Sequence, residues 1–191
     1  MPIVKLMPYM ELGALPNVSE TNLPPLDRGN YKTVEIMRGC ARRYSTHPVI
    51  RNLALKILEQ AGTRSHNFLD EARAIGEFVQ KEVKYVRDIE GVEQLHSPLY
   101  LIEHIKRGTA RGDCDDMSLL IATLLLSIGH SPYFAIVRYQ DMAGPYNHIY
   151  VVEYDKNWGP QPRRRIVLDA ILKDRPIGSE VPYRSGKEIK V

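Results

Sequence analysis

The sequence predicts an α+β fold in which N-terminal helices and one central, buried helix pack on an antiparallel sheet. Two observations lead to this prediction. Apolar residues recur at helical spacing from about residue 48 to residue 128, and the period then changes to two. The length of 191 residues, with 43% hydrophobic and 26% charged residues, is sufficient for one substantial core. We therefore expect one domain with an extension.

Residues 1–44 are predicted to be an extended N-terminal arm. The segment is rich in proline, glycine and asparagine and shows no sustained helical period. It could equally be a tail that binds a partner. The folded domain is then expected over residues 45–191.

Three helices are expected at the start of this domain. The first begins at Pro48 and stops at Gly62, the second follows Asn67, and the third opens at Ser97 and closes at Gly108. A fourth helix runs from Cys114 to the next glycine at residue 129 and is apolar nearly all round. A helix of that kind is central and buried.

The strands come last. Residues 133–139, 148–154 and 165–169 are β-branched and aromatic, and turn-forming stretches separate them. Strands that follow each other with such connections predict an antiparallel meander.

Composition excludes several classes of function. The net charge is +3, and the basic residues are scattered except at residues 163–165, so nucleic-acid binding is not expected. No apolar run is long enough to span a bilayer, and the N-terminus lacks the features of a signal peptide. We therefore expect a cytoplasmic protein with no membrane partner. Two cysteines, Cys40 and Cys114, do not make a disulfide framework.

Cys114 is the candidate nucleophile. It lies in the first turn of the buried helix, where unpaired N–H groups and the helix dipole favour an anion, so its thiol pKa should be lowered. The neighbouring Asp113, Asp115 and Asp116 act partly in the opposite direction. These carboxylates lack the spacing of a calcium loop, so capping is the preferred interpretation and no metal or other cofactor is expected.

His148 and Asp169 are the candidate base and its orienting carboxylate. If their strands pair about a turn at residues 157–160, the two residues stand directly opposite each other on one face. Their β-carbons would then be about 4.5–5.5 Å apart, close enough for the carboxylate to accept the imidazole N–H. Cys114, His148 and Asp169 together supply the nucleophile, base and orienter of acyl transfer through a thioester.

The stretches GDCDDMSLLIATLLLSIGHSPYFAIV, NHIYVVEY and IVLDA resemble the core of the transglutaminase-like superfamily, which is related to papain. The resemblance covers residues 83–172 and implies a papain/transglutaminase-like fold with Cys114, His148 and Asp169 as the triad. The superfamily often has a tryptophan a few residues before its aspartate, whereas Trp158 lies eleven before Asp169. The short chain is also similar to transglutaminase-like proteins of bacteriophage and prophage regions.

Two functions follow from these features. The first is a cysteine peptidase, amidase or transglutaminase-type acyltransferase that acts on a protein or peptide substrate. The alternative is a structural or assembly component of a phage virion that keeps the fold and holds other virion proteins through its N-terminal arm. The second function would place the protein in the virion.

Overall fold

The computed structural model describes residues 3–7, 19–25, 27–64, 66–88, 92–139, 144–155 and 164–191. Its helices are α1 (Asp27–Ser45), α2 (Pro48–Ala61), α3 (Phe68–Glu82), α4 (Pro98–Lys106) and α5 (Cys114–Ser127). Its strands are β1 (Ile3–Met7), β2 (Ser19–Asn22), β3 (Lys84–Tyr85), β4 (Val92–His96), β5 (Arg111–Gly112), β6 (Tyr133–Tyr139), β7 (His148–Tyr154), β8 (Arg165–Leu168) and β9 (Tyr183–Lys190). These elements confirm the predicted α+β class.

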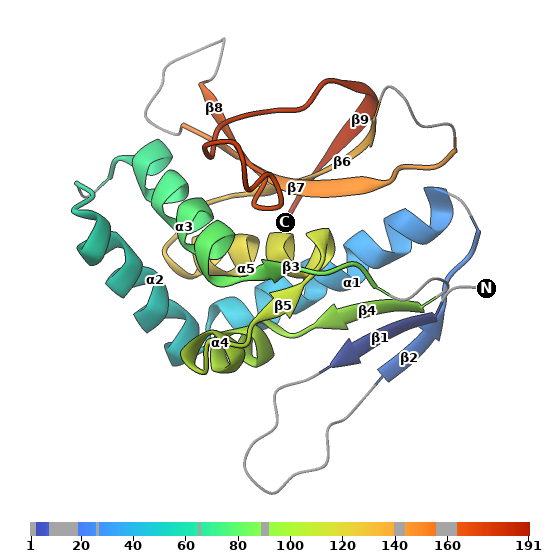
Figure 1. Ribbon diagram of the computed structural model, residues 1–191, viewed down its shortest axis with the longest axis horizontal. Helices are drawn as coiled ribbons and strands as arrows, with labels where there is room; N and C mark the ends of the chain where they lie inside the picture. Colours follow the sequence, from blue (N-terminus) through green and yellow to red (C-terminus); the bar gives the residue numbers. More distant parts are fainter. Residues whose placement is uncertain are drawn as a thin grey trace, which may run out of the picture.

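Helix α5 is the centre of the molecule. The four-stranded sheet lies on one side of it and α4 on the other, while α1, α2 and α3 also pack against it (Figure 1). Every residue of α5 except Cys114 and Leu126 is buried. The prediction of a central helix is therefore confirmed, because a helix with apolar residues on all sides is stable only when protein surrounds it.

The predicted helix ends are also found. Helix α2 begins at Pro48, and the His47 imidazole accepts the backbone N–H of Val49. Gly62 ends the helix in the left-handed conformation at φ 63°, which glycine adopts without steric cost. Helix α4 begins after Ser97, whose hydroxyl accepts the backbone N–H of Tyr100.

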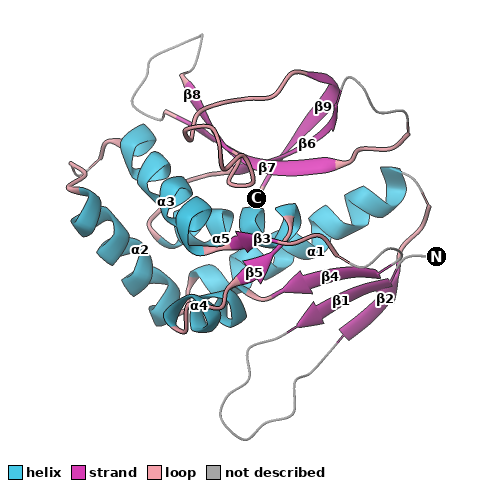
Figure 2. Ribbon diagram, viewed as in Figure 1, coloured by secondary structure: helices cyan, strands magenta, loops and turns pink. Residues whose placement is uncertain are grey.

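The main sheet has the strand order β8-β7-β6-β9, and all of its neighbouring strands are antiparallel. The three predicted strands are present. The sequence reasoning missed β9. This edge strand is mostly exposed, and it has too few apolar residues to show an alternating pattern. Two small sheets, β2-β1-β4 and β3-β5, lie apart from the main one (Figure 2).

The prediction of an extended arm over residues 1–44 is wrong for its second half. Residues 27–45 form α1, which packs along α5, and Val34, Met37 and Ala41 are at most 2% exposed. These residues do recur at helical spacing, but charged side chains and Gly39 lie between them and weaken the pattern. Only β1 and β2 of the described residues in this segment are extended strands.

None of the helices in the described parts of the chain is both long enough and apolar enough to cross a membrane.

Candidate active site

Each residue of the sequence GDCDD, at 112–116, has a local structural role. The Asp113 carboxylate accepts the backbone N–H groups of Asp115 and Asp116, at 3.0 and 3.2 Å, and so caps α5. Strand β5 leads into this cap and pairs in parallel with β3. A β-carbon on Gly112 would lie 2.7 Å from that of Asp116, so only glycine allows the strand to approach the helix start this closely. The predicted capping role is confirmed for Asp113.

The fully buried Asp116 is bonded to His96, the last residue of β4. One carboxylate oxygen accepts the His96 backbone N–H and the other pairs with its Nδ1, both at 2.7 Å. Burial lowers the pKa of His96, but the hydrogen bond and charge of Asp116, with the charge of Asp88, raise it above its ordinary value. This pair ties β4 to the first turn of α5, and sequence reasoning missed it because the partners are 20 residues apart.

His148 and Asp169 are in direct contact, as predicted. Nε2 of His148 lies 2.8 Å from Oδ2 of Asp169, and the two side chains are 2% and 3% exposed. The predicted register is wrong, however. It would put Ile166 opposite Val151, whereas the structure has Leu168 there.

The shift in register is two residues, so it keeps every side chain on its predicted face. His148 and Asp169 are therefore diagonal neighbours rather than direct partners, and such neighbours are still within reach of long side chains. Because an ionised carboxylate only accepts hydrogen bonds, we assign the proton of this contact to Nε2. Nδ1 is then the ring nitrogen that can take a proton from a substrate or a thiol. The turn at residues 157–160, including Trp158, lies outside the described residues.

One pocket of about 230 Å³ brings the candidate nucleophile and base together, since Cys114 and His148 both line it. Helix α1 supplies a wall that sequence reasoning did not predict, because it placed this segment in an extended arm. Asn30 of that wall donates a hydrogen bond of 2.7 Å to the Tyr146 carbonyl. The complete lining is Asn30, Thr33, Val34, Asp113, Cys114, Asp115, Ile136, Tyr146, Asn147, His148 and Ile149.

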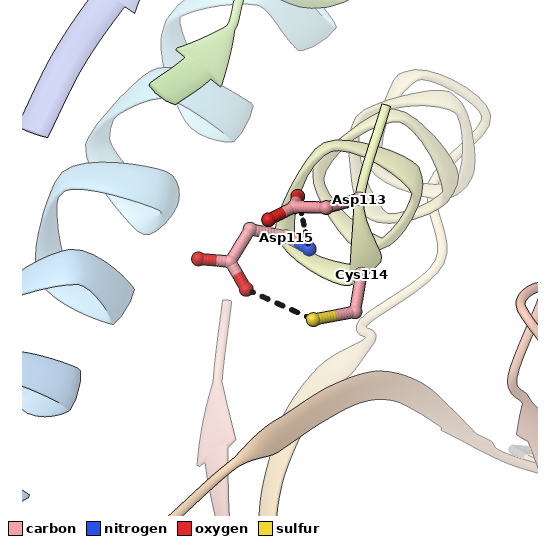
Figure 3. A group of neighbouring side chains, drawn as sticks. All are labelled: Asp113, Cys114 and Asp115. Atoms are coloured by element: carbon pink, nitrogen blue, oxygen red, sulfur yellow. Dashed lines mark hydrogen bonds between the residues drawn. The ribbon is translucent and has the colours of Figure 1, made fainter. Parts of the chain in front are cut away.

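The Cys114 thiol is hydrogen-bonded to Asp115 and not to His148 in the described part of the chain. Cys114 Sγ donates to Oδ1 of Asp115 at 3.5 Å, as Figure 3 shows, and no hydrogen bond joins it to His148 among the described residues. Burial, followed by the charges of Asp115 and Asp113, raises the pKa of Cys114 well above its ordinary value. The prediction of a lowered pKa is therefore wrong. The capping carboxylate of Asp113 already occupies the N–H groups that were expected to stabilise a thiolate.

Donor atoms of Asp113, Cys114 and Asp115 all lie within 4.8 Å of one another, a spacing that could hold a metal ion. In the structure Oδ1 of Asp113 accepts the capping N–H groups, and Oδ1 of Asp115 accepts the thiol. Cys40, the other cysteine, is buried in α1 and does not line the pocket, and burial raises its pKa to about 12.

Comparisons with known proteins add little to these observations. No family model matches the sequence, and no curated protein matches it. Among solved structures the chain is similar to Legionella pneumophila LapG, with a TM-score of 0.43 and 16% sequence identity over 82% of this chain and 76% of that chain. A likeness of this strength assigns neither a family nor an activity, so the transglutaminase-like resemblance stays a prediction. The comparisons give no support to a phage or prophage origin.

Proposed function

We propose that this chain is a cysteine-dependent amide hydrolase or acyltransferase that acts on a protein or peptide substrate through a thioester. Cys114 is the nucleophile, His148 the general base and Asp169 the residue that orients the imidazole. The observation that carries the proposal is the buried contact of 2.8 Å between His148 and Asp169 at a pocket that Cys114 also lines. A paired imidazole beside a helix-start thiol is the arrangement that acyl transfer requires.

The raised thiol pKa defines how the reaction begins. The resting thiol is protonated and bonded to Asp115, so it must turn toward Nδ1 of His148, which takes its proton as the sulfur attacks the carbonyl carbon. The backbone N–H of Cys114 is the candidate donor to the resulting oxyanion. The imidazolium then protonates the departing amine as the carbon–nitrogen bond breaks, leaving a thioester.

The second half of the reaction restores the enzyme. Neutral imidazole removes a proton from an incoming water or amine, which attacks the thioester carbonyl, and the sulfur leaves and regains the proton. Water gives hydrolysis and an amine gives transamidation.

Trapping of the acyl-enzyme tests this function directly. We expect that incubation with a peptide mixture and hydroxylamine yields peptide hydroxamates by mass spectrometry, and that Cys114→Ala abolishes them. Asp169→Asn should lower their rate by about a hundredfold or more, since the imidazole loses its orienting acceptor. The matched control is Cys40→Ala, which removes the buried thiol outside the pocket. Equal hydroxamate yield from wild type and Cys114→Ala would exclude the proposal.

The alternative is a structural or assembly component of a virion that holds a neighbouring protein through its N-terminal arm. Helix α1 packs along α5, so this role would fall to the proline-rich residues before residue 27. No contact of the described residues favours this alternative over an enzyme.

A further inference from the structure

Tyr139 lies against the imidazole of His148. It is the last residue of β6, and Val137, two residues earlier, stands opposite His148 in β7. Tyr139 is thus a diagonal neighbour of His148 on the same face of the sheet. The two rings are stacked, with centroids 5.2 Å apart and an angle of 22° between their planes.

A second ring also contacts the imidazole. Tyr150 follows His148 by two residues in β7, and its ring centroid lies 5.7 Å from that of His148 at an angle of 41°. Tyr150 is itself buried, and its hydroxyl donates to Glu180 at 2.8 Å. Tyr139 differs from it, because it is only partly buried while the His148 and Asp169 side chains are almost fully enclosed. Tyr139 therefore contacts both solvent and the imidazole.

The backbone of Tyr139 is fixed from the His148 side. The side chain of Asn147, the residue before His148, accepts the Tyr139 backbone N–H at 3.3 Å. The Asn147 backbone N–H in turn donates to the Val137 carbonyl at 3.0 Å. The pairing of β6 with β9 also changes register between Arg138 and Tyr139, an irregularity of the kind that redirects a side chain near a site.

We propose that Tyr139 is a positioning residue whose ring covers one face of His148 and keeps water from the hydrogen bond between His148 and Asp169. The covered bond holds the imidazole in the orientation and tautomer in which Nδ1 is free to accept the thiol proton. The catalytic part of this role rests on the proposed function, whereas the contact that covers His148 is present in the folded chain whatever its function. The aromatic ring of Tyr139 provides this cover, and its hydroxyl group does not.

The electrostatics of the phenol agree with this placement. Burial, followed by the charges of Asp169 and Cys114, raises the pKa of Tyr139 above its ordinary value. The phenol is therefore neutral where its ring stacks on the imidazole. A hydrogen bond that water does not reach is electrostatically stronger than an exposed one, so loss of the ring should weaken the orientation of His148.

The test measures the His148 proton and needs no substrate. In histidine-labelled protein, we expect wild type and Tyr139→Phe to show the same downfield Nε2–H resonance with similar exchange lifetimes. Tyr139→Leu should shorten that lifetime by about five- to tenfold, because the bond becomes open to water. Tyr139→Met is the second variant if the leucine protein does not fold. Tyr154→Leu, another partly buried tyrosine of this face, is the matched control and should leave the lifetime unchanged.

Two outcomes would refute the proposal that the Tyr139 ring covers His148. The first is an unchanged lifetime in the folded leucine or methionine variant. The second is a phenylalanine variant as impaired as the leucine one, which would assign the role to the hydroxyl. The hydroxamate assay on wild type separates this proposal from the proposed function. A lifetime shortened in Tyr139→Leu, together with no hydroxamate from wild type, supports the role of Tyr139 and refutes the proposed function. Hydroxamate from wild type, together with an unchanged lifetime in Tyr139→Leu, supports the proposed function and refutes the role of Tyr139.

Discussion

Replacement of Asp115 by asparagine should make Cys114 more reactive toward iodoacetamide at neutral pH. The carboxylate accepts the S–H at 3.5 Å and disfavours the thiolate. Two unit charges about 4 Å apart at an effective dielectric constant of about 20 repel each other by about 4 kcal/mol, and solvent in the open pocket screens part of this. We take about 1.4–2.8 kcal/mol as the net gain, which is about a 10- to 100-fold increase in thiolate.

The alkylation rate should rise less than the thiolate population, because nucleophilicity falls with pKa by a Brønsted slope of about 0.45. The expected increase is therefore about 4- to 12-fold at pH 7. The assay is mass spectrometry of Cys114 alkylation over time, with Cys40 as the internal reference and Asp115→Glu as the control that keeps the charge. An unchanged or slower rate in Asp115→Asn, with Asp115→Glu equal to wild type, would refute the electrostatic account of the raised pKa.

Two further predictions concern the residues that hold the first turn of α5. Gly112→Ala should lower the free energy of unfolding by about 1–3 kcal/mol in denaturant titrations, because the new methyl group would overlap the Asp116 side chain. His96→Gln should destabilise the protein most at acidic pH. The pKa of His96 is raised in the folded state, so its stabilisation is fully present below the unfolded value of about 6.5 and is lost as the pH rises through the folded value. The stability difference between wild type and His96→Gln should therefore shrink from pH 6 to pH 9.

Each of these has a control within the chain. Gly39 lies in α1, and a methyl group added there would meet no atom of the surrounding elements within 4 Å, so Gly39→Ala should instead stabilise the protein by about 0.5–1 kcal/mol. His104 pairs with the neutral carbonyl of Tyr100 at 2.9 Å rather than with a carboxylate, so His104→Gln is the matched control for the loss of a histidine. A Gly112→Ala protein as stable as Gly39→Ala, or a His96→Gln difference that grows with pH, would contradict the assigned contacts.

The sequence predicts those elements whose own residues carry a strong periodic signal. Helix α5 and strands β6, β7 and β8 are found because their apolar patterns are dense, and the helix ends at Pro48 and Gly62 are found because proline and glycine restrict the backbone locally. Helix α1 and strand β9 are missed for the opposite reason. Charged residues dilute their patterns, and only the partner elements in the folded chain determine their conformations.

One part of the candidate site is predictable from the sequence and another part is not. The contact of His148 with Asp169 is predictable because faces alternate with period two, so even a register that is wrong by two residues brings the pair together. The direction of the Cys114 pKa is not predictable from a helix start alone. It depends first on the burial of the thiol in the folded chain, and then on the placement of the Asp115 and Asp113 carboxylates.

Because α1 supplies one wall of the pocket, the pocket is complete only after α1 has packed against the rest of the chain. Asn30, Thr33 and Val34 of α1 lie far along the chain from the imidazole of β7, yet with the thiol of α5 they line a single pocket. A partly folded chain in which α1 has not docked carries the thiol but lacks one wall of that pocket. The complete pocket therefore forms only in the complete tertiary structure, and a chain shortened to begin after residue 45 would lose both core packing and one side of the pocket.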